Sequence, residues 1–282
     1  MSFAIQSSLF GSNTAGRFGN QFFQLLFFYI ISEKIGCTIR LPAWKGQLVF
    51  ENHHFKDPIP VENIYNLELI YSRVDGPEST INMIKPLFNL FPDTLDIIGS
   101  FQFNTDTLYK FRHILDQNFI FTDSANFIKM QLNQIQKNDA LICIHWREGD
   151  YNDFNNQHPF FWKSDFSNLL IEIKKLIAIS GVHSKVYVAS DNPKNIIDYL
   201  KSQGIEVLSA RNFTTNINDF FLWDFMSLVA SDIIVASNSS FSIAGALFNK
   251  NAQIFSRSNS PTEEFCTFLP WRTEILKNQF LS

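Results

Sequence analysis

Four clusters of polar residues follow apolar segments of this chain, and each contains groups that could bind an anion. Residues 16–21 read GRFGNQ, residues 145–151 read HWREGDY, residues 188–192 read VASDN, and residues 237–242 read SNSSFS. Glycine amides, an arginine fork and the amides at a helix start all bind phosphate oxygens. A single cluster would be weak evidence, but four at the ends of successive predicted strands indicate one convergent site.

The first cluster joins Gly16, Arg17, Gly19 and Asn20 to an apolar run, Phe22–Ile31. That run is too short for a membrane span, which needs about 20 apolar residues. The start of the chain, MSFAIQSSLF, has no basic residue and does not resemble a signal peptide. We therefore interpret the cluster as a phosphate-facing turn before a buried helix, in which the glycines allow positive φ and a close approach of the backbone to an anion. A plain tight turn is the alternative.

The cluster HWREGDY places Arg147 directly after an apolar segment, where its fork could grip a diphosphate. An ion pair with Glu148 or Asp150 is the alternative for this arginine. His145 alternates with core residues, so it is either a buried structural histidine or a ligand contact. Asp191 could accept hydrogen bonds from N1 and N2 of guanine, or it could cap the following helix.

The serines of the last cluster offer hydroxyls and helix-start amides, but serines at that position are often only helix caps. The six histidines show no metal-binding spacing, and neither Gly-x-Ser-x-Gly nor a Walker Gly-Lys-Ser occurs. A diphosphate-gripping arginine without a visible metal cage suggests a nucleotide-sugar transferase. Its leaving group is a nucleoside diphosphate, whose developing charge arginine and amide dipoles can stabilise.

The elements that position these clusters alternate between strand and helix. Strands are expected in residues 3–10, 36–42, 95–103, 139–146, 184–191, 205–210 and 232–240. Helices are expected in residues 21–35, 104–115, 164–181, 192–204, 219–231 and 240–248. Residues 42–96, with six prolines, are expected to form loops and short helices. The pattern predicts an α/β fold with parallel sheets, whose carboxyl strand ends carry the ligand site.

The 282 residues, 45% of them apolar, suit two doubly wound domains, and we place the boundary at residues 137 and 138. A cleft between the domains is the expected site. A last helix that packs back on the first domain is one option for the C-terminal residues. The net charge of −4 argues against nucleic-acid binding. The cysteines Cys37, Cys143 and Cys266 are expected to be buried free thiols in a reducing compartment.

At these clusters the sequence resembles glycosyltransferase family 11, the α-1,2-fucosyltransferases. The stretches GRFGNQFFQ, HWREGDY and NSSFSIAGALFN look like that family's Gly-Asn, His-x-Arg-Arg-Gly-Asp-Tyr and Asn-Ser-Ser-Phe-Ser motifs. IIGSFQF is similar to its Gly-Tyr-Phe-Gln stretch, and VASDN to its Ser-Asp-Asp stretch. The similar segments keep the family's order over roughly residues 10–275.

The resemblance implies a GT-B fold of two Rossmann-like domains, GDP-fucose as donor, inversion at the anomeric carbon, a glycan acceptor, and no metal or other cofactor. Arg147 would hold the β-phosphate and His145 would support it. Asn20 and neighbouring amides would face the donor. Asp191 would contact guanine or ribose. The implied catalytic set is Arg147, Asp150 and His145, and the implied donor-binding set is Gly16, Arg17, Gly19, Asn20, Arg147, Asp191, Ser239, Ser240 and Phe241.

Two departures from the family's motifs bear on the donor. Glu148 stands where the family has a second arginine, and Ile243 and Ala244 replace two tryptophans, which would reshape the wall of the site. A different GDP-hexose donor, or a non-catalytic nucleotide- or sugar-binding module, are the alternative functions.

The general base is not legible, because Asp150, Asp153 and His158 could all reach the site and Asp150 could instead orient Arg147. Lacking an apolar span, the protein is expected in the cytoplasm, with peripheral membrane attachment as the alternative.

Overall fold

The protein forms two compact units, Met1–Ser124 and Ala125–Ser282, in a computed structural model. The structure describes residues 3–10, 17–51, 57–61, 64–67, 74–91, 93–148, 166–181, 183–257 and 264–273. Helix α5 belongs to the second unit apart from its first two residues, whereas the boundary predicted at residues 137 and 138 follows that helix. The C-terminal helix considered above lies outside the described residues.

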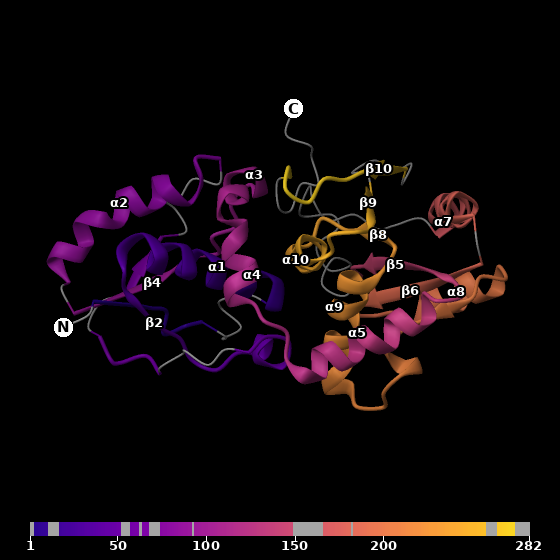
Figure 1. The fold of residues 1–282 in the computed structure, drawn as a ribbon, viewed down its shortest axis with the longest axis horizontal. Coiled ribbons are helices and arrows are strands. Elements are labelled where there is room, and N and C mark those ends of the chain that lie inside the picture. The colour runs from indigo at the N-terminus through magenta and orange to yellow at the C-terminus, as the bar shows by residue number, and fades with distance from the viewer. Residues whose placement is uncertain are drawn as a thin grey trace. The chain divides into compact units, whose positions relative to one another are not determined.

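Unit 1 contains a parallel sheet with the strand order β2-β1-β4-β3. Its elements are β1 (Ala4–Gln6), α1 (Phe18–Ile35), β2 (Thr38–Arg40), the 3₁₀ helix η2 (Lys45–Leu48), β3 (Ile64–Asn66), α2 (Gly76–Leu90), β4 (Thr94–Ile98), α3 (Thr105–Leu108), the 3₁₀ helix η3 (Tyr109–Phe111) and α4 (Arg112–Asn118) (Figure 1). The expected βαβ start of the chain is confirmed.

Helix α1 is the centre of unit 1, and all of its residues from Gln21 to Ile31 are buried. Aromatic rings surround it: Phe27 lies 4.4 Å from Phe101, and Phe22 lies 4.9 Å from Phe119, measured between ring centroids. A helix that is apolar on all sides must be covered on all sides, which explains why the short apolar run is a core helix. Among the described residues, no helix is long and apolar enough to cross a membrane.

Helix α2 is longer than the loops and short helices expected from the prolines of residues 42–96. Pro77 occupies its first turn, where the missing N–H does no harm, and Pro86 lies exposed within it. The helix buries Ile81 and Ile84 on one face. Tertiary packing of that face outweighs the local cost of the inner proline.

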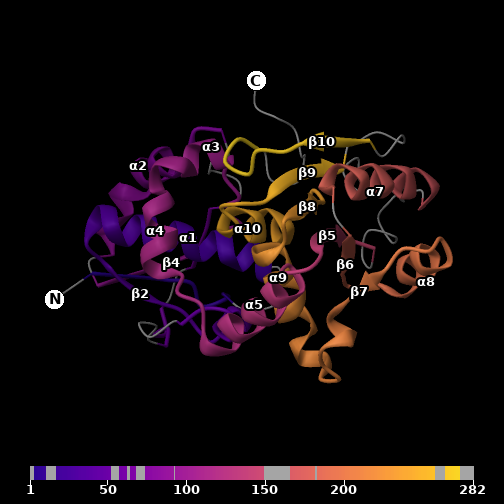
Figure 2. The same ribbon diagram turned by 45° about the vertical axis from the view of Figure 1, so that its right-hand side comes forward.

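Unit 2 contains a six-stranded sheet with the order β10-β9-β8-β5-β6-β7, parallel except for β10 (Figure 2). Its elements are α5 (Asp123–Ile135), β5 (Ala140–Trp146), α7 (Phe166–Ser180), β6 (Ser184–Ser190), α8 (Lys194–Ser202), β7 (Val207–Leu208), the 3₁₀ helices η4 (Ala210–Asn212) and η5 (Ile217–Asp219), α9 (Phe220–Ala230), β8 (Ile233–Ala236), α10 (Ser240–Phe248), β9 (Gln253–Arg257) and β10 (Phe265–Thr267). The predicted strands β5 to β8 are confirmed.

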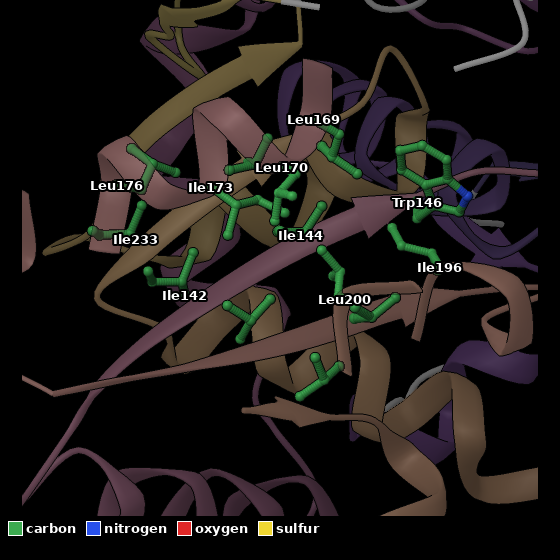
Figure 3. Packing of buried hydrophobic residues seen from close by; sticks show 14 residues of the cluster. Ile142, Ile144, Trp146, Leu169, Leu170, Ile173, Leu176, Ile196, Leu200 and Ile233 are labelled. Carbon is green, nitrogen blue, oxygen red and sulfur yellow. The ribbon is translucent and has the colours of Figure 1, made fainter. Parts of the chain in front are cut away.

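Strand β5 is buried on both faces, as a central parallel strand should be. Ile142, Ile144 and Trp146 lie on the face that α7 and α8 cover, and Figure 3 shows Leu169 and Ile173 of α7 packed toward them. Cys143 and His145 alternate with these residues and therefore point to the opposite face, where Ser227 of α9 contacts the Cys143 Sγ atom at 3.1 Å. Helices thus cover both faces, and the α/β class is confirmed.

The prediction of three buried thiols holds for Cys37 and Cys143 and is wrong for Cys266, which is exposed. Cys266 lies in β10, an edge strand whose alternate side chains face away from the core. Burial raises the pKa of the Cys143 thiol to about 12, so this cysteine is inert.

Candidate functional site

The sheet of unit 2 has a topological switch point between β5 and β8. The chain runs outward from β5 to β6 and β7, then returns to β8 on the other side of β5. Ligands of open α/β sheets bind outside the carboxyl ends of the strands at this point, because the connections diverge there and leave room. Arg147 follows β5, and Ser237 follows β8. Two of the predicted clusters therefore flank the switch point.

A buried hydrogen bond joins these two clusters. The Nδ1 atom of His145 lies 2.7 Å from Oγ of Ser237, and both residues are buried. The imidazole ring also contacts Phe241, with ring centroids 5.2 Å apart. His145 is therefore a hydrogen-bonded core residue that also lies at the expected ligand edge. The structure is compatible with both alternatives, a buried structural histidine and a ligand contact.

Arg147 forms an ion pair that the sequence did not suggest. Its Nε atom lies 3.3 Å from Oδ2 of Asp191, which follows β6, rather than pairing as considered with Glu148. The other oxygen of Asp191, Oδ1, accepts a hydrogen bond from the backbone amide of Glu148 at 3.1 Å. Asp191 is not the cap of α8, whose N-cap is Pro193, so the capping alternative is wrong. The cluster VASDN thus contacts the cluster HWREGDY.

The serines of the fourth cluster begin helix α10 and are largely engaged within it. Ser239 is the N-cap, and its Oγ accepts a hydrogen bond from the amide of Phe241 at 3.3 Å. Ser242 Oγ donates to the carbonyl oxygens of Ser237 and Ser239. The capping alternative is therefore correct for Ser239. Ser240, Phe241 and the other first-turn residues place the positive end of the α10 dipole at the same edge.

The departures from the family motifs have different structural consequences. Ile243 and Ala244 are fully buried in α10, so they change the packing beneath the helix and are not an exposed wall of the site. Glu148 is partly exposed, but its Oε2 atom is buried and accepts no hydrogen bond in the described part of the chain. A carboxylate therefore stands beside Arg147.

Unit 1 has its own switch point, between β1 and β4. Asn20 lies in the first turn of α1, which follows β1, and its Oδ1 atom accepts a hydrogen bond from Nε2 of Gln102 at 2.6 Å. Gln102 follows β4 and is buried. The GRFGNQ and GSFQF stretches are therefore joined across this switch point. Gln102 is a further candidate site residue, which the sequence motifs contained but did not single out.

An unusual backbone conformation places Gln102. The preceding residue, Phe101, has φ of 46°, in the left-handed region that only glycine adopts freely. Its ring packs into the unit 1 core, and a Cβ atom at Gly99 would lie 2.8 Å from it, so glycine is required there. Such strain is retained where the surrounding core dictates it, and it often marks functional sites.

The expected role of Gly19 needs a correction. Helix α1 begins at Phe18, earlier than predicted, so Gly19 lies within its first turn and does not have positive φ. The ring of Phe18 stacks on Trp44 with centroids 5.6 Å apart, which holds this early turn in the helix. Gly19 is buried and Arg17, the N-cap residue, is exposed.

Several predicted residues lie outside the described residues. They are Gly16 and the three candidate bases Asp150, Asp153 and His158.

Two further ionisable residues lie at the same edge of unit 2 and were missed. Asp224 of α9 accepts a hydrogen bond from Tyr187 Oη at 3.1 Å, and burial raises the pKa of its carboxyl to about 8. Arg211, in η4 after β7, is exposed and lowers that pKa electrostatically. No motif marked either residue, because Asp224 lies in the middle of an apolar helix and Arg211 in a short turn.

The described residues contain no group of three or more His, Cys, Asp and Glu side chains that could hold a metal ion. A shallow pocket of about 390 Å³ lies at the opposite edge of the unit 2 sheet, beside Asp139, Asp232 and Gln253. It borders the amino ends of β5, β8 and β9, and Asp139 there is paired with Lys185. The residue chemistry and the switch point both favour the carboxyl edge instead.

No protein-family model matches the sequence, and no curated protein matches it either. Solved structures do match. POFUT1 in complex with GDP gives a TM-score of 0.57 at 13% identity, covering 90% of this chain and 97% of that one. The fucosyltransferase NodZ from Bradyrhizobium gives 0.55 at 13% identity, covering 92% and 96%. FUT1 of Arabidopsis thaliana in complex with GDP gives 0.58 at 12% identity, covering 93% and 71%.

At these identities the likeness establishes the fold. The chain has an α/β fold of the GT-B type, with one Rossmann-like parallel sheet in each unit, as the motifs implied.

Proposed function

We propose that this protein is a glycosyltransferase that moves fucose from GDP-fucose to a hydroxyl group of a glycan acceptor, with inversion and without a metal. The observation that carries the proposal is Arg147 at the carboxyl end of β5, held by Asp191 beside the switch point and the start of α10. The similar structures add support, because POFUT1 and FUT1 were solved with GDP and NodZ was also soaked with GDP-fucose.

The proposed chemistry depends on stabilising the leaving group. As the glycosidic bond breaks, negative charge grows on the β-phosphate of GDP, and the Arg147 guanidinium neutralises it. The N-terminus of α10, which begins at Ser240, faces the same anion with the positive end of its dipole. His145 supports this arrangement by tying the β5 end to Ser237. A positively charged protein group and a helix dipole then do what a metal ion does in other transferases.

The acceptor hydroxyl attacks the anomeric carbon from the side opposite the departing diphosphate, which inverts the configuration. A base must take the hydroxyl proton, and Asp150 is our candidate from the HWREGDY motif. Asn20 and Gln102 of unit 1 are proposed to contact the bound substrates through their side-chain amides. The proposal of an α-1,2 linkage rests on the motif resemblance alone.

A different GDP-hexose donor is the second candidate, and Glu148 is the observation that favours it. A carboxylate replaces the second arginine beside Arg147, so this edge carries one positive charge fewer and one negative charge more than the family's motif provides. A carboxylate can accept hydrogen bonds from sugar hydroxyls, and it could thereby select a donor sugar other than fucose.

The test is a calorimetric titration with GDP, UDP, GDP-fucose and GDP-mannose in buffer that contains a chelator. We expect GDP and GDP-fucose to bind and UDP to bind weakly. Arg147→Ala should abolish the binding of both guanine ligands. Arg112→Ala is the matched control, because Arg112 is an exposed arginine of α4 in unit 1.

Turnover is then measured as GDP release with a panel of glycans, and NMR of the product gives the anomeric configuration. If the protein prefers GDP-mannose to GDP-fucose, the proposed fucose donor is replaced by a different GDP-hexose, the second candidate. Binding of UDP alone, or of no nucleotide, would refute the proposed function. GDP-fucose binding without turnover on any acceptor would favour the binding-module alternative.

A further inference from the structure

Asp224 of α9 contacts the carboxyl end of β6 at the turn that carries Asp191. Its Oδ1 atom accepts a hydrogen bond from Tyr187 Oη at 3.1 Å. The backbone amide of Ser190 also lies near this carboxyl and lowers its pKa. Ser190 is the last residue of β6 and directly precedes Asp191. Asp224 therefore fixes the point at which Asp191 leaves the sheet.

Asp191 carries this constraint to the neighbouring strand. One carboxylate oxygen lies 3.3 Å from Nε of Arg147, and the other accepts the backbone amide of Glu148 at 3.1 Å. A continuous chain of polar contacts thus runs from Tyr187, fully buried in the sheet, through Asp224 and the Ser190–Asp191 turn to Arg147. Moving any member of the chain would change where the guanidinium lies.

We propose that Asp224 is a positioning residue of the donor site, which holds the Ser190–Asp191 turn so that Asp191 presents the Arg147 guanidinium to the donor diphosphate. This inference rests on the proposed function, because a diphosphate donor is what gives Arg147 its task. Asp224 itself touches neither the donor nor the reacting atoms.

The charge of Asp224 matters for this role. Burial and the neighbouring Asp191 raise the pKa of its carboxyl, whereas the hydrogen bond from Tyr187, the nearby amide of Ser190 and the charge of Arg211 lower it. Together these effects raise the pKa to about 8. Cys143 of β5 also faces it, but as a neutral thiol. The carboxyl is therefore largely neutral near neutral pH. Above its pKa it adds a negative charge beside Asp191, which opposes the binding of an anionic donor.

The experiment measures GDP affinity by calorimetry for the whole protein and its variants at about pH 7 and about pH 9, one unit on either side of the Asp224 pKa. Asp224→Ala removes the acceptor for Tyr187 and the carboxyl beside the Ser190 amide, and it should weaken GDP binding roughly tenfold. Asp224→Asn keeps an acceptor oxygen and cannot ionise. Its affinity should match the wild type at the lower pH and exceed it at the higher pH.

The Asn variant also corrects for the titration of GDP itself, which affects both proteins equally. Asp198→Asn, on the exposed side of α8, is the matched control and should behave as the wild type at both pH values. Hydrogen exchange gives a readout that needs no nucleotide. In Asp224→Ala and in Tyr187→Phe, the amides of Ser190 and Glu148 should exchange faster, whereas Tyr199→Phe should leave them unchanged.

The outcomes separate this inference from the proposed function. A folded Asp224→Ala protein that binds GDP like the wild type, while Arg147→Ala does not, overturns the positioning role and leaves the proposed function intact. Unchanged amide exchange at Ser190 and Glu148 overturns it as well. The wild type could bind no GDP while the amides of Ser190 and Glu148 still exchange faster in Asp224→Ala. That result would overturn both the donor-site role of Asp224 and the proposed function, and would leave only the structural contacts from Tyr187 to Arg147.

Discussion

The Nδ1 atom of His145 lies 2.7 Å from the Oγ atom of Ser237, although 92 residues separate them in the chain. This bond crosses the switch point between β5 and β8, and it is buried in the part of unit 2 that carries Arg147 on one strand end and helix α10 on the other. The two motifs therefore lie together at one edge of the unit 2 sheet. The roles of the residues at this edge can be tested one by one.

Arg147→Ala should lower kcat/KM by roughly 10²–10³, the usual effect of removing one group that stabilises developing charge. Arg147→Lys should restore only part of this, because an ammonium lacks the fork that engages Asp191 and the diphosphate together. Steady-state kinetics with the donor identified by calorimetry would measure both changes. A rate for Arg147→Ala close to that of the exposed control Arg112→Ala would contradict the role of Arg147.

Asp191→Asn should weaken the binding of GDP and of inosine diphosphate by similar factors. The reason is that the Asp191 carboxylate already engages Arg147 and the Glu148 amide, so its loss disturbs the diphosphate grip common to both nucleotides. Inosine keeps N1–H and lacks only the guanine N2 amino group, so the ratio of the two affinities is a direct reading of contacts to N2. A loss confined to GDP would show instead that Asp191 reads guanine.

Ser239→Ala should lower the free energy of unfolding by about 0.5–2 kcal/mol, because it removes the cap of α10. Ser239→Asn keeps a side-chain acceptor and should retain most of the stability. Denaturant unfolding of the two variants beside the wild type measures the difference. Equal stability of the Ala and Asn variants would mean that the capping bond contributes little.

Gln102→Ala and Asn20→Ala should each destabilise unit 1, and the double variant should lose less than the sum of the two. The hydrogen bond between these side chains is partly buried, and such a bond contributes about 0.5–1.5 kcal/mol net. A double-mutant cycle from denaturant unfolding measures the coupling. Full additivity would indicate that the two amides act independently.

The stability of the protein should depend on pH through Asp224. The pKa of its carboxyl is about 8 when folded, against about 3.9 for an unfolded aspartate. The folded state therefore holds a proton that the unfolded state has lost, and the contribution of Asp224, fully present below about pH 4, declines as the pH rises toward 8. Asp224→Asn removes this decline, so the variant should gain stability over the wild type, by about 1.4 kcal/mol per unit of pKa difference.

Thermal and denaturant unfolding between about pH 5 and pH 9 would measure this difference, with Asp198→Asn as the exposed control. The gap between Asp224→Asn and the wild type should widen up to about pH 8 and then stay constant. A gap that does not change with pH would mean that the Asp224 carboxyl ionises normally in the folded protein.

The sequence by itself determined the order of strands and helices in unit 2 from β5 to α10, whereas α5, β9 and β10 were not predicted. Strands such as residues 140–146 are short apolar runs bounded by polar turns, and helices such as α7 repeat their apolar residues with helical spacing, so local patterns were sufficient. Parallel strands share their carboxyl edge, and for this reason the clusters that contain Arg147, Asp191 and Ser239 could be assigned to one site in advance.

Only the tertiary structure decided which of these side chains meet. The Arg147–Asp191 pair could not be read from the sequence, because the register of β5 and β6 brings Trp146 opposite Ser190 and so sets the residues after them side by side. The pKa of Asp224 and the burial of Ile243 and Ala244 likewise depend on which elements cover them. Helix α2 is longer than the short helices expected there, because the packing of its buried face outweighs the local cost of Pro86, and only the folded chain supplies that packing.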